Sequence, residues 1–143
     1  MSHFLSPAED LLIVEAVQLA EKGTSGEIRV HFAKKIKKDV LTDAKNTFEE
    51  LKMHQTKVRN GVLIYMVLQE KQFSIIGDIG IDQKTGDSFW QSCRNAMQIE
   101  FSKGEIALGI IKGIEAVKEV LKKDFPYQNE DVNELSDEIS KDE

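Results

Sequence analysis

Residues 61–68 read G-V-L-I-Y-M-V-L, and this apolar stretch decides the fold of the chain. Seven consecutive apolar residues without a charge are typical of a strand that is buried on both faces, and they are too few to span a membrane. Polar residues occupy positions 69–72, and residues 73–79 are again strand-like. The two segments are therefore expected to pair as a hairpin.

Upstream of this hairpin, residues 27–32 (E-I-R-V-H-F) alternate between polar and apolar side chains. The alternation predicts a half-buried strand, with His31 on its exposed side. Between this strand and residue 61, apolar residues at steps of three and four predict a helix; they are Leu41, Ala44, Phe48 and Leu51. A strand, a helix and a second strand in this order form a crossover, so the two strands should be parallel.

Three further helices complete the body of the chain. Residues 6–9 (S-P-A-E) combine a serine cap, a proline at the first helical position and a glutamate three residues after the cap, which predicts a helix that ends at Gly23. Apolar spacing predicts the other two helices over about residues 88–101 and 103–121. The order of elements predicts an α/β fold with three layers: a short mixed β-sheet of three to four strands, flanked by helices on both faces.

Charge is concentrated at one end of the chain. The 143 residues carry a net charge of −6, and residues 128–143 alone hold seven acidic residues and one lysine, which also sum to −6. Residues 1–127 are therefore expected to form one domain without net charge, followed by a disordered acidic tail. Four lysines within residues 34–38 have no aromatic partners, so they indicate a solvated loop and not a nucleic-acid site.

The cellular compartment is predicted from the targeting signals that the sequence lacks. No signal peptide or membrane segment is found, so a soluble, cytoplasmic protein is expected. The single cysteine, Cys93, excludes an internal disulfide and lies on the apolar face of a predicted helix, where a buried thiol is expected.

Residues 77–87 (G-D-I-G-I-D-Q-K-T-G-D) carry the candidate site, with Asp78, Asp82 and Asp87 in a glycine-rich span. The hairpin returns this span to the end of the sheet where the parallel strands begin, so it should meet residues 24–27 and 59–61. Backbone and carboxylate oxygens on loops favour a hard cation, which predicts a calcium site, with magnesium as the alternative. The supporting residues of these loops are Asn60, Gly61 and Gly80.

Each acidic residue also has a purely structural interpretation. The aspartates of a surface turn often cap backbone N–H groups, and Asp87 precedes Ser88 at a predicted helix start, which is an N-cap position. Glu105 follows Ser102 by three residues, the spacing of a capping box. Glu27, at the start of a strand, is either solvated or part of the metal site.

Four segments in order resemble the TPM domain family: T-S-G-E-I-R-V at 24–30, R-N-G-V-L-I-Y at 59–65, G-D-I-G-I-D at 77–82, and F-S-K-G-E-I-A-L-G-I-I-K-G-I at 101–114. The resemblance covers about residues 7–122. It implies a central sheet flanked by helices, and a divalent cation, commonly calcium, bound by acidic loops at one end of the sheet. It also implies acid phosphatase activity, which is reported for plant members.

The resemblance also assigns roles to individual acidic residues. Asp82 stands where the family usually has glutamate, Asp87 matches a recurrent aspartate before the next helix, and Glu105 matches the acidic residue after the F-x-x-G of the last helix. Asp78 departs from the pattern, because members more often have glycine there.

The sequence thus predicts a domain whose partner is a divalent metal ion, with no nucleic acid and no known protein partner. One alternative is a weak metal-dependent acid phosphatase that acts through metal-bound water or a carboxylate, although no catalytic residue can be named. A second alternative is a protein-interaction module.

Overall fold

The computed structural model describes residues 5–126 and 139–142. The elements follow the chain in this order: α1 (Pro7–Glu21), β1 (Glu27–Phe32), α2 (Val40–Glu50), the 3₁₀ turn η1 (Met53–Gln55), β2 (Gly61–Val67), the 3₁₀ turn η2 (Leu68–Glu70), β3 (Gln72–Gly77), α3 (Ile79–Thr85), α4 (Asp87–Ser102), α5 (Ile106–Asp124) and β4 (Ser140–Lys141).

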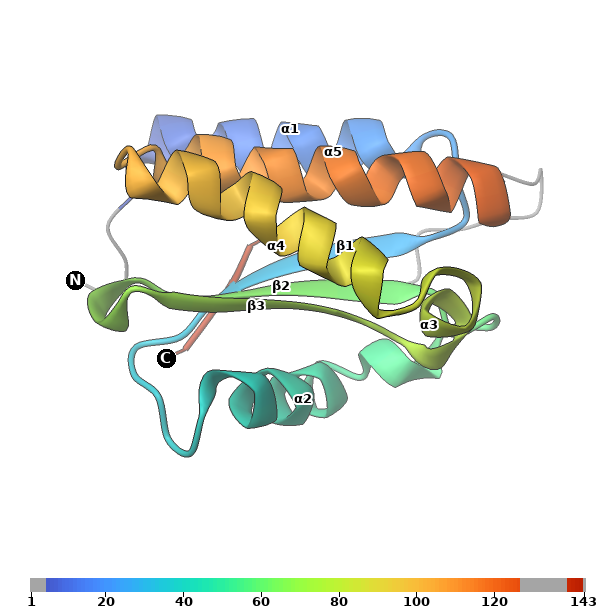
Figure 1. Ribbon diagram of the computed structural model, residues 1–143, viewed down its shortest axis with the longest axis horizontal. Helices are drawn as coiled ribbons and strands as arrows, with labels where there is room; N and C mark the ends of the chain where they lie inside the picture. The colour runs from blue at the N-terminus through green and yellow to red at the C-terminus, as the bar shows by residue number, and fades with distance from the viewer. Residues whose placement is uncertain (1–4, 127–138, 143) are drawn as a thin grey trace.

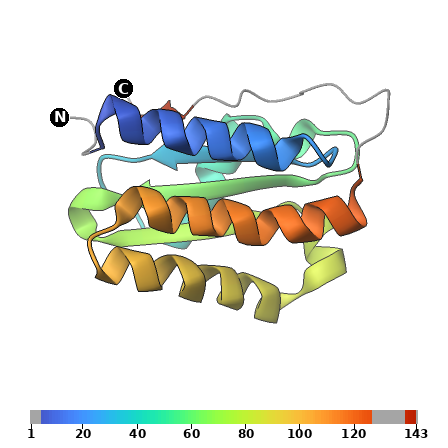
Figure 2. The same cartoon turned by 90° about the horizontal axis from the view of Figure 1, so that it is seen from above.

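The sheet separates two unequal layers of helices (Figure 1). Helices α1, α4 and α5 lie side by side over one face (Figure 2), and α2 covers the other. The larger core, between the sheet and the three helices, includes Ile28, Ile64 and Ile110, and the smaller core, under α2, includes Phe48 and Leu63. The predicted three-layer α/β fold is confirmed.

Strand pairing also follows the prediction. The strand order is β3-β2-β1-β4. β1 and β2 are parallel, from Glu27 opposite Gly61 to Phe32 opposite Met66, and β2 and β3 are antiparallel. Every residue of β2 is buried, as expected for a strand with helices on both of its faces.

The two ends of the α4–α5 connection differ from the expected capping box. Helix α4 continues through Ser102, and α5 begins at Ile106 with Glu105 as an N-cap that makes no side-chain cap bond. Gly104, with φ +80°, turns the chain between the helices, in a conformation that glycine adopts at little cost. The Ser102 hydroxyl instead accepts a hydrogen bond from Gln98. The predicted box between Ser102 and Glu105 is therefore wrong.

Two of the three polar residues of β1 are buried, contrary to the half-buried strand expected from its alternation, and Arg29 is partly exposed. Glu27 is 4% exposed and His31 is 5% exposed. The His31 ring stacks on Tyr65 with ring centroids 5.5 Å apart, and its Nδ1 and Nε2 lie 2.9 Å from Ser140 Oγ and Asp142 Oδ1. The C-terminal residues thus cover His31, which a pattern local to β1 does not reveal.

Part of the acidic tail is a strand. β4 pairs in parallel with β1, with Ser140 opposite His31, and Asp142 accepts a hydrogen bond from the Lys34 amide as well as contacting His31. The predicted disorder is wrong for residues 139–142, because composition averaged over the tail hides these specific partners. Residues 128–138 and 143 of the predicted tail lie outside the described residues.

Cys93 lies on α4, one of the helices that pack on the sheet. Cys93 is fully buried, and this burial raises the pKa of its thiol to about 11, as expected for an inert core cysteine. Among the helices in residues 5–126, none is long and apolar enough to cross a membrane.

Candidate functional site

The span expected to be an irregular turn contains helix α3. The Asp78 carboxylate caps this helix by accepting a hydrogen bond from the Ile79 amide at 2.8 Å, and Ile81 anchors the helix in the core at 0% exposure. A Cβ on Gly80 would lie 2.3 Å from the Val58 carbonyl oxygen. The glycine therefore serves the close packing of α3 on the chain before β2, and the turn prediction for residues 79–85 is wrong.

The predicted meeting of three segments at one rim of the sheet is confirmed. The Glu27 amide donates to the Asn60 carbonyl at 3.4 Å, and the Asn60 side chain donates to Ser25 Oγ at 3.3 Å. The Gly80 amide donates to the Arg59 carbonyl at 2.9 Å. Residues 24–27, 59–61 and 78–80 are thus tied together where β1 and β2 begin.

Asp78 is held in an ion pair at this rim. Its Oδ2 accepts from Arg59 Nε at 2.6 Å and its Oδ1 from Arg59 Nη2 at 2.8 Å. The hydrogen bond to Asp78 raises the pKa of the Arg59 guanidinium. Since Oδ1 also caps Ile79, both carboxylate oxygens of this buried aspartate are engaged with protein donors, and Asp78 anchors β3, α3 and residue 59 to each other.

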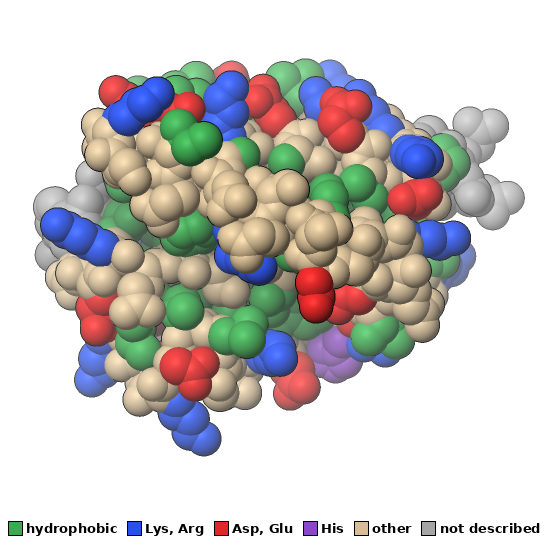
Figure 3. All heavy atoms as spheres, viewed as in Figure 1, with side chains coloured by type: hydrophobic (Ala, Val, Ile, Leu, Met, Phe, Trp, Pro, Cys, Tyr) green, Lys and Arg blue, Asp and Glu red, His purple; other side chains and the backbone are tan. Residues whose placement is uncertain are grey.

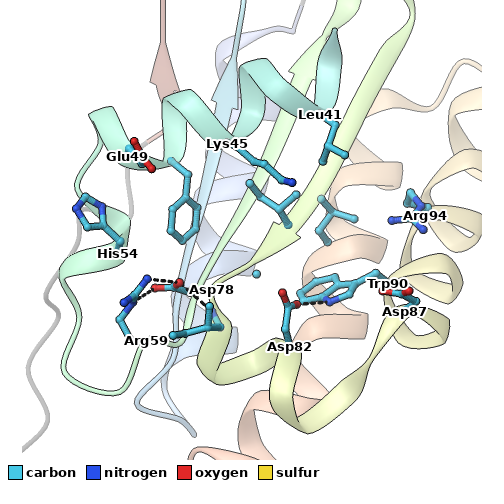
Figure 4. Close-up of a pocket in the computed structure, with 15 residues that line it drawn as sticks. Leu41, Lys45, Glu49, His54, Arg59, Asp78, Asp82, Asp87, Trp90 and Arg94 are labelled. Atoms are coloured by element: carbon cyan, nitrogen blue, oxygen red, sulfur yellow. Dashed lines mark hydrogen bonds and ion pairs between the residues drawn. The ribbon is translucent and has the colours of Figure 1, made fainter.

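A cavity of about 420 Å³ opens beside β3, between α2 and the start of α4 (Figure 4). Its floor is apolar and its walls carry charges of both signs. The lining residues are Leu41, Lys45, Phe48, Glu49, His54, Arg59, Ile75, Ile76, Gly77, Asp78, Ile79, Asp82, Asp87, Trp90 and Arg94. Three of the five predicted metal ligands, Asp78, Asp82 and Asp87, therefore line one cavity.

Asp82 and Asp87 flank the Trp90 indole at the α3–α4 end of this cavity (Figure 4). Trp90 Nε1 donates to Asp82 Oδ1 at 2.8 Å, and the indole lies so close to Gly77 that a Cβ there would be 2.4 Å from its ring. Asp82 is exposed despite this bond. Its carboxylate is thus oriented by a buried donor while it remains accessible from the cavity.

Asp87 is the first residue of α4 and not its N-cap. The cap position belongs to Gly86, with φ +80°, and no side chain caps this helix. The predicted N-cap role of Asp87 is therefore wrong. Its exposed carboxylate makes no hydrogen bond or ion pair within the described residues, and its place in the first turn puts it at the positive end of the helix dipole.

The other two predicted ligands do not line the cavity. Glu27 is buried beside Asn60 at the rim. Glu105 lies at the opposite end of the sheet, because α4 carries the chain away from the rim over 16 residues, about 24 Å. Among residues 5–126 and 139–142, no three His, Cys, Asp or Glu side chains form a ready-made metal-binding group.

Most residues of the cavity were not predicted as site residues from the sequence, among them Lys45, Arg59, Trp90 and Arg94. The ion pair between Arg59 and Asp78 joins positions 19 apart, and no local pattern marks it. Trp90 offered one signal, since it is the only tryptophan of the chain and lies three residues after Asp87. Lys45 and Arg94 are on helices, where an exposed cation is ordinary.

These features define a class of protein, the layered α/β domains with a charged cavity at one rim of a mixed sheet. The TPM domain family model matches residues 1–120. The chain belongs to the TPM domain family, so the resemblance in its four motifs is confirmed. No curated protein sequence matches the chain.

Solved structures agree with this membership. The chain is similar to the BA42 protein of the psychrophilic bacterium Bizionia argentinensis, with 44% identity over 98% of this chain and 97% of that one, and a TM-score of 0.91. The N-terminal domain of a P. gingivalis protein shares the fold at 19% identity, covering 87% of this chain and 80% of that one, with a TM-score of 0.70. The N-terminal domain of the cg2496 protein of Corynebacterium glutamicum shares it at 17% identity, with coverages of 82% and 74% and a TM-score of 0.66.

Proposed function

We propose that this domain binds a divalent cation, calcium in the first place, at the α3–α4 end of the rim cavity. The observation that carries the proposal is the pair Asp82 and Asp87, whose exposed carboxylates line the same cavity from either side of Trp90. Only Oδ1 of Asp82 is engaged by a protein donor, and Asp87 has no partner within the described chain. Asp78 takes a supporting role, because Arg59 occupies both of its oxygens.

Calcium suits this donor set better than other common ions. It accepts carboxylate, backbone and water oxygens in a flexible geometry, and two aspartates leave room for water in the rest of the shell. Zinc prefers nitrogen or sulfur ligands, but Cys93 is buried in the core and His54 lines the cavity on the side away from Asp82 and Asp87 (Figure 4). Magnesium remains the alternative, since it is often held by one or two carboxylates and several waters. Calcium binding is also what the resemblance to TPM domains implies.

Trp90 provides a direct experiment, because it is the only tryptophan and contacts Asp82. Addition of calcium to protein treated with chelator should change the fluorescence of Trp90 with saturation. Asp82→Asn and Asp87→Asn should each weaken this binding by about tenfold or more. Glu49→Gln is the matched control, since Glu49 lines the same cavity from α2. Equal affinities for the wild type and both aspartate variants would refute the assignment.

A weak metal-dependent phosphatase is the second candidate, and one observation favours it. Lys45 and Arg94 line the same cavity, and neither forms an ion pair within the described residues, so both are available to a phosphate group. Water on the proposed ion would supply the nucleophile. Release of nitrophenol from its phosphate ester that stops with chelator and in Asp82→Asn would support this candidate. Turnover unaffected by either change would exclude it.

A further inference from the structure

β3 is an edge strand with unused backbone groups. The Asp78 amide donates to the Gly61 carbonyl. Along the antiparallel ladder between β2 and β3, pairs that are hydrogen-bonded to each other alternate with pairs that are not. Ser74 and Ile76 therefore bond β2, whereas the N–H and C=O groups of Phe73, Ile75 and Gly77 point away from the sheet. The hydrogen bonds of the described residues include none to the outward groups of Ile75 and Gly77.

This edge forms the base of the groove between α2 and α4. Ile75 and Gly77 both line the 420 Å³ cavity, and the space-filling view shows apolar side chains among charged ones between the two helical layers (Figure 3). Two large apolar side chains of the lining are solvent-exposed, Leu41 at 46% and Ile79 at 52%. A sheet edge with unpaired backbone groups, at the base of an apolar groove, can bind an extended peptide as an additional strand.

The charges on the two walls indicate the chemistry of that peptide. Lys45 lies on α2 and Arg94 on α4, on opposite sides of the edge, and both extend toward the cavity (Figure 4). Lys45 has no ion pair within the described chain, and Arg94 donates only to the neutral Gln91 side chain, at 3.0 Å. A carboxylate on a strand beside Ile75 would meet one of these cations. The walls also carry acidic side chains, Glu49 on α2 and Asp82 and Asp87 near the start of α4, so a carboxylate is favoured only in the space between Lys45 and Arg94.

We propose that the β3 edge is a docking site for an extended, β-branched peptide segment of a partner protein, with an acidic residue placed between Lys45 and Arg94. The segment would bond the outward groups of Phe73, Ile75 and Gly77. Ile75 is 1% exposed, so the segment can reach its backbone only if the side chains that cover the edge move aside. The β3 edge would thus be the surface through which the domain acts as a protein-interaction module. Binding at this edge does not depend on calcium.

Two synthetic heptapeptides test the proposal: acetyl-STVEVTS-amide and its matched control acetyl-STVKVTS-amide. Each is titrated into ¹⁵N-labelled protein up to millimolar concentration, with chelator present. The acidic peptide should bind with saturation, shift the amides of Phe73, Ile75 and Gly77, and slow their hydrogen exchange. The amides of Ser74 and Ile76, already bonded to β2, are internal controls whose exchange should change little. The lysine peptide should bind about tenfold more weakly.

Two sets of variants separate strand addition from simple charge attraction. Lys45→Glu combined with Arg94→Glu should reverse the preference between the peptides, whereas Lys123→Glu on α5 should not. N-methylation of one residue of the acidic peptide should abolish binding, whereas N-methylation of the adjacent residue should not. Only every second backbone N–H of the bound strand faces β3.

Three results would overturn the proposal. The first is the absence of saturable binding by the acidic peptide. The second is binding that leaves the exchange of the Ile75 and Gly77 amides unchanged, which indicates contact through charged side chains alone. The third is protection of these amides that rises with protein concentration and without peptide, which assigns the edge to a second copy of the chain.

Discussion

The Trp90 indole donates its N–H to Asp82 Oδ1 at 2.8 Å, and this bond joins α4 to α3 at one end of the rim cavity. Trp90 is 7% exposed, so the donor is fixed by packing against Gly77 and the core. A ligand carboxylate that is held in place by a second residue binds metal more tightly than a free one.

Trp90→Phe should therefore weaken calcium binding by about tenfold. The replacement keeps an aromatic ring in the core but removes the donor. Calorimetric titration of both proteins with calcium checks this expectation. Because phenylalanine is smaller, the variant will also lose stability, and the comparison is made well below its Tm. An unchanged calcium affinity in a folded variant would show that the bond does not orient a ligand.

Asp78→Ala should destabilise the domain by about 2 kcal/mol or more, since it removes the cap of α3 and the buried partner of Arg59. Urea denaturation measures the loss. Asp87→Ala, at an exposed position without a partner in the described chain, is the matched control and should change the free energy of unfolding by less than about 1 kcal/mol in the absence of calcium, because only its interaction with the α4 dipole is lost. Equal losses in the two variants would contradict the structural role given to Asp78.

Gly80→Ala should also destabilise the fold, by about 1–3 kcal/mol, because the added Cβ would meet backbone carbonyl oxygens at 2.3 and 2.6 Å. Backbone cannot move aside as a flexible side chain does, so α3 should shift away from residues 58–59. Gly104→Ala is the control, since its Cβ would meet nothing within 4 Å and its cost is confined to the φ of +80°. The amide shifts of residues 78–87 should change in the first variant only.

Acid should destabilise the fold through the buried side chain of His31. Burial, the largest effect, lowers the pKa of His31; contact with Asp142 opposes this shift and the charge of Arg29 adds to it. Burial alone would raise the pKa of Asp142, but hydrogen bonds from the Lys34 amide and His31 lower it. Both pKa values are lowered in the folded protein, so the unfolded chain binds protons more readily as the pH falls. The stability that the two groups contribute is therefore full at neutral pH. The contribution of His31 is lost as the pH falls below about 6.5.

The free energy of unfolding should consequently decrease between pH 7.5 and 5, because the buried His31 is harder to protonate in the folded protein than in the unfolded chain. His31→Gln should flatten this dependence, whereas His54→Gln should retain it. A free energy of unfolding that stays constant across the interval would contradict the role of His31.

Local patterns predicted the parts of the fold that local physics determines. The capping box at Ser6 and Glu9 formed as expected, and the uninterrupted apolar run at residues 61–68 gave the central strand. The crossover rule then placed the candidate loops at one rim. Each of these inferences depends on a short segment or on a general rule of chain connection.

The errors arose where distant residues decide the outcome. His31 appeared to face water because its cover, Ser140 and Asp142, lies 109 and 111 positions away. The glycines of residues 77–86 suggested a turn, but Gly80 serves the close approach of α3 to residues 58–59. Asp78 resembled a metal ligand by type, and only the structure shows that Arg59 neutralises it.

A thermal melt with calcium or with chelator tests the central claim most directly. An ion that binds only the folded state stabilises it by about 2.7 kcal/mol at 100 times its Kd, so calcium should raise the Tm of the wild type by about 4 °C or more. Asp82→Asn should abolish most of this gain, and it should melt slightly above the wild type in chelator because one repelling charge near Asp87 is removed. Identical curves for the wild type with calcium and with chelator would contradict a cation site at Asp82 and Asp87.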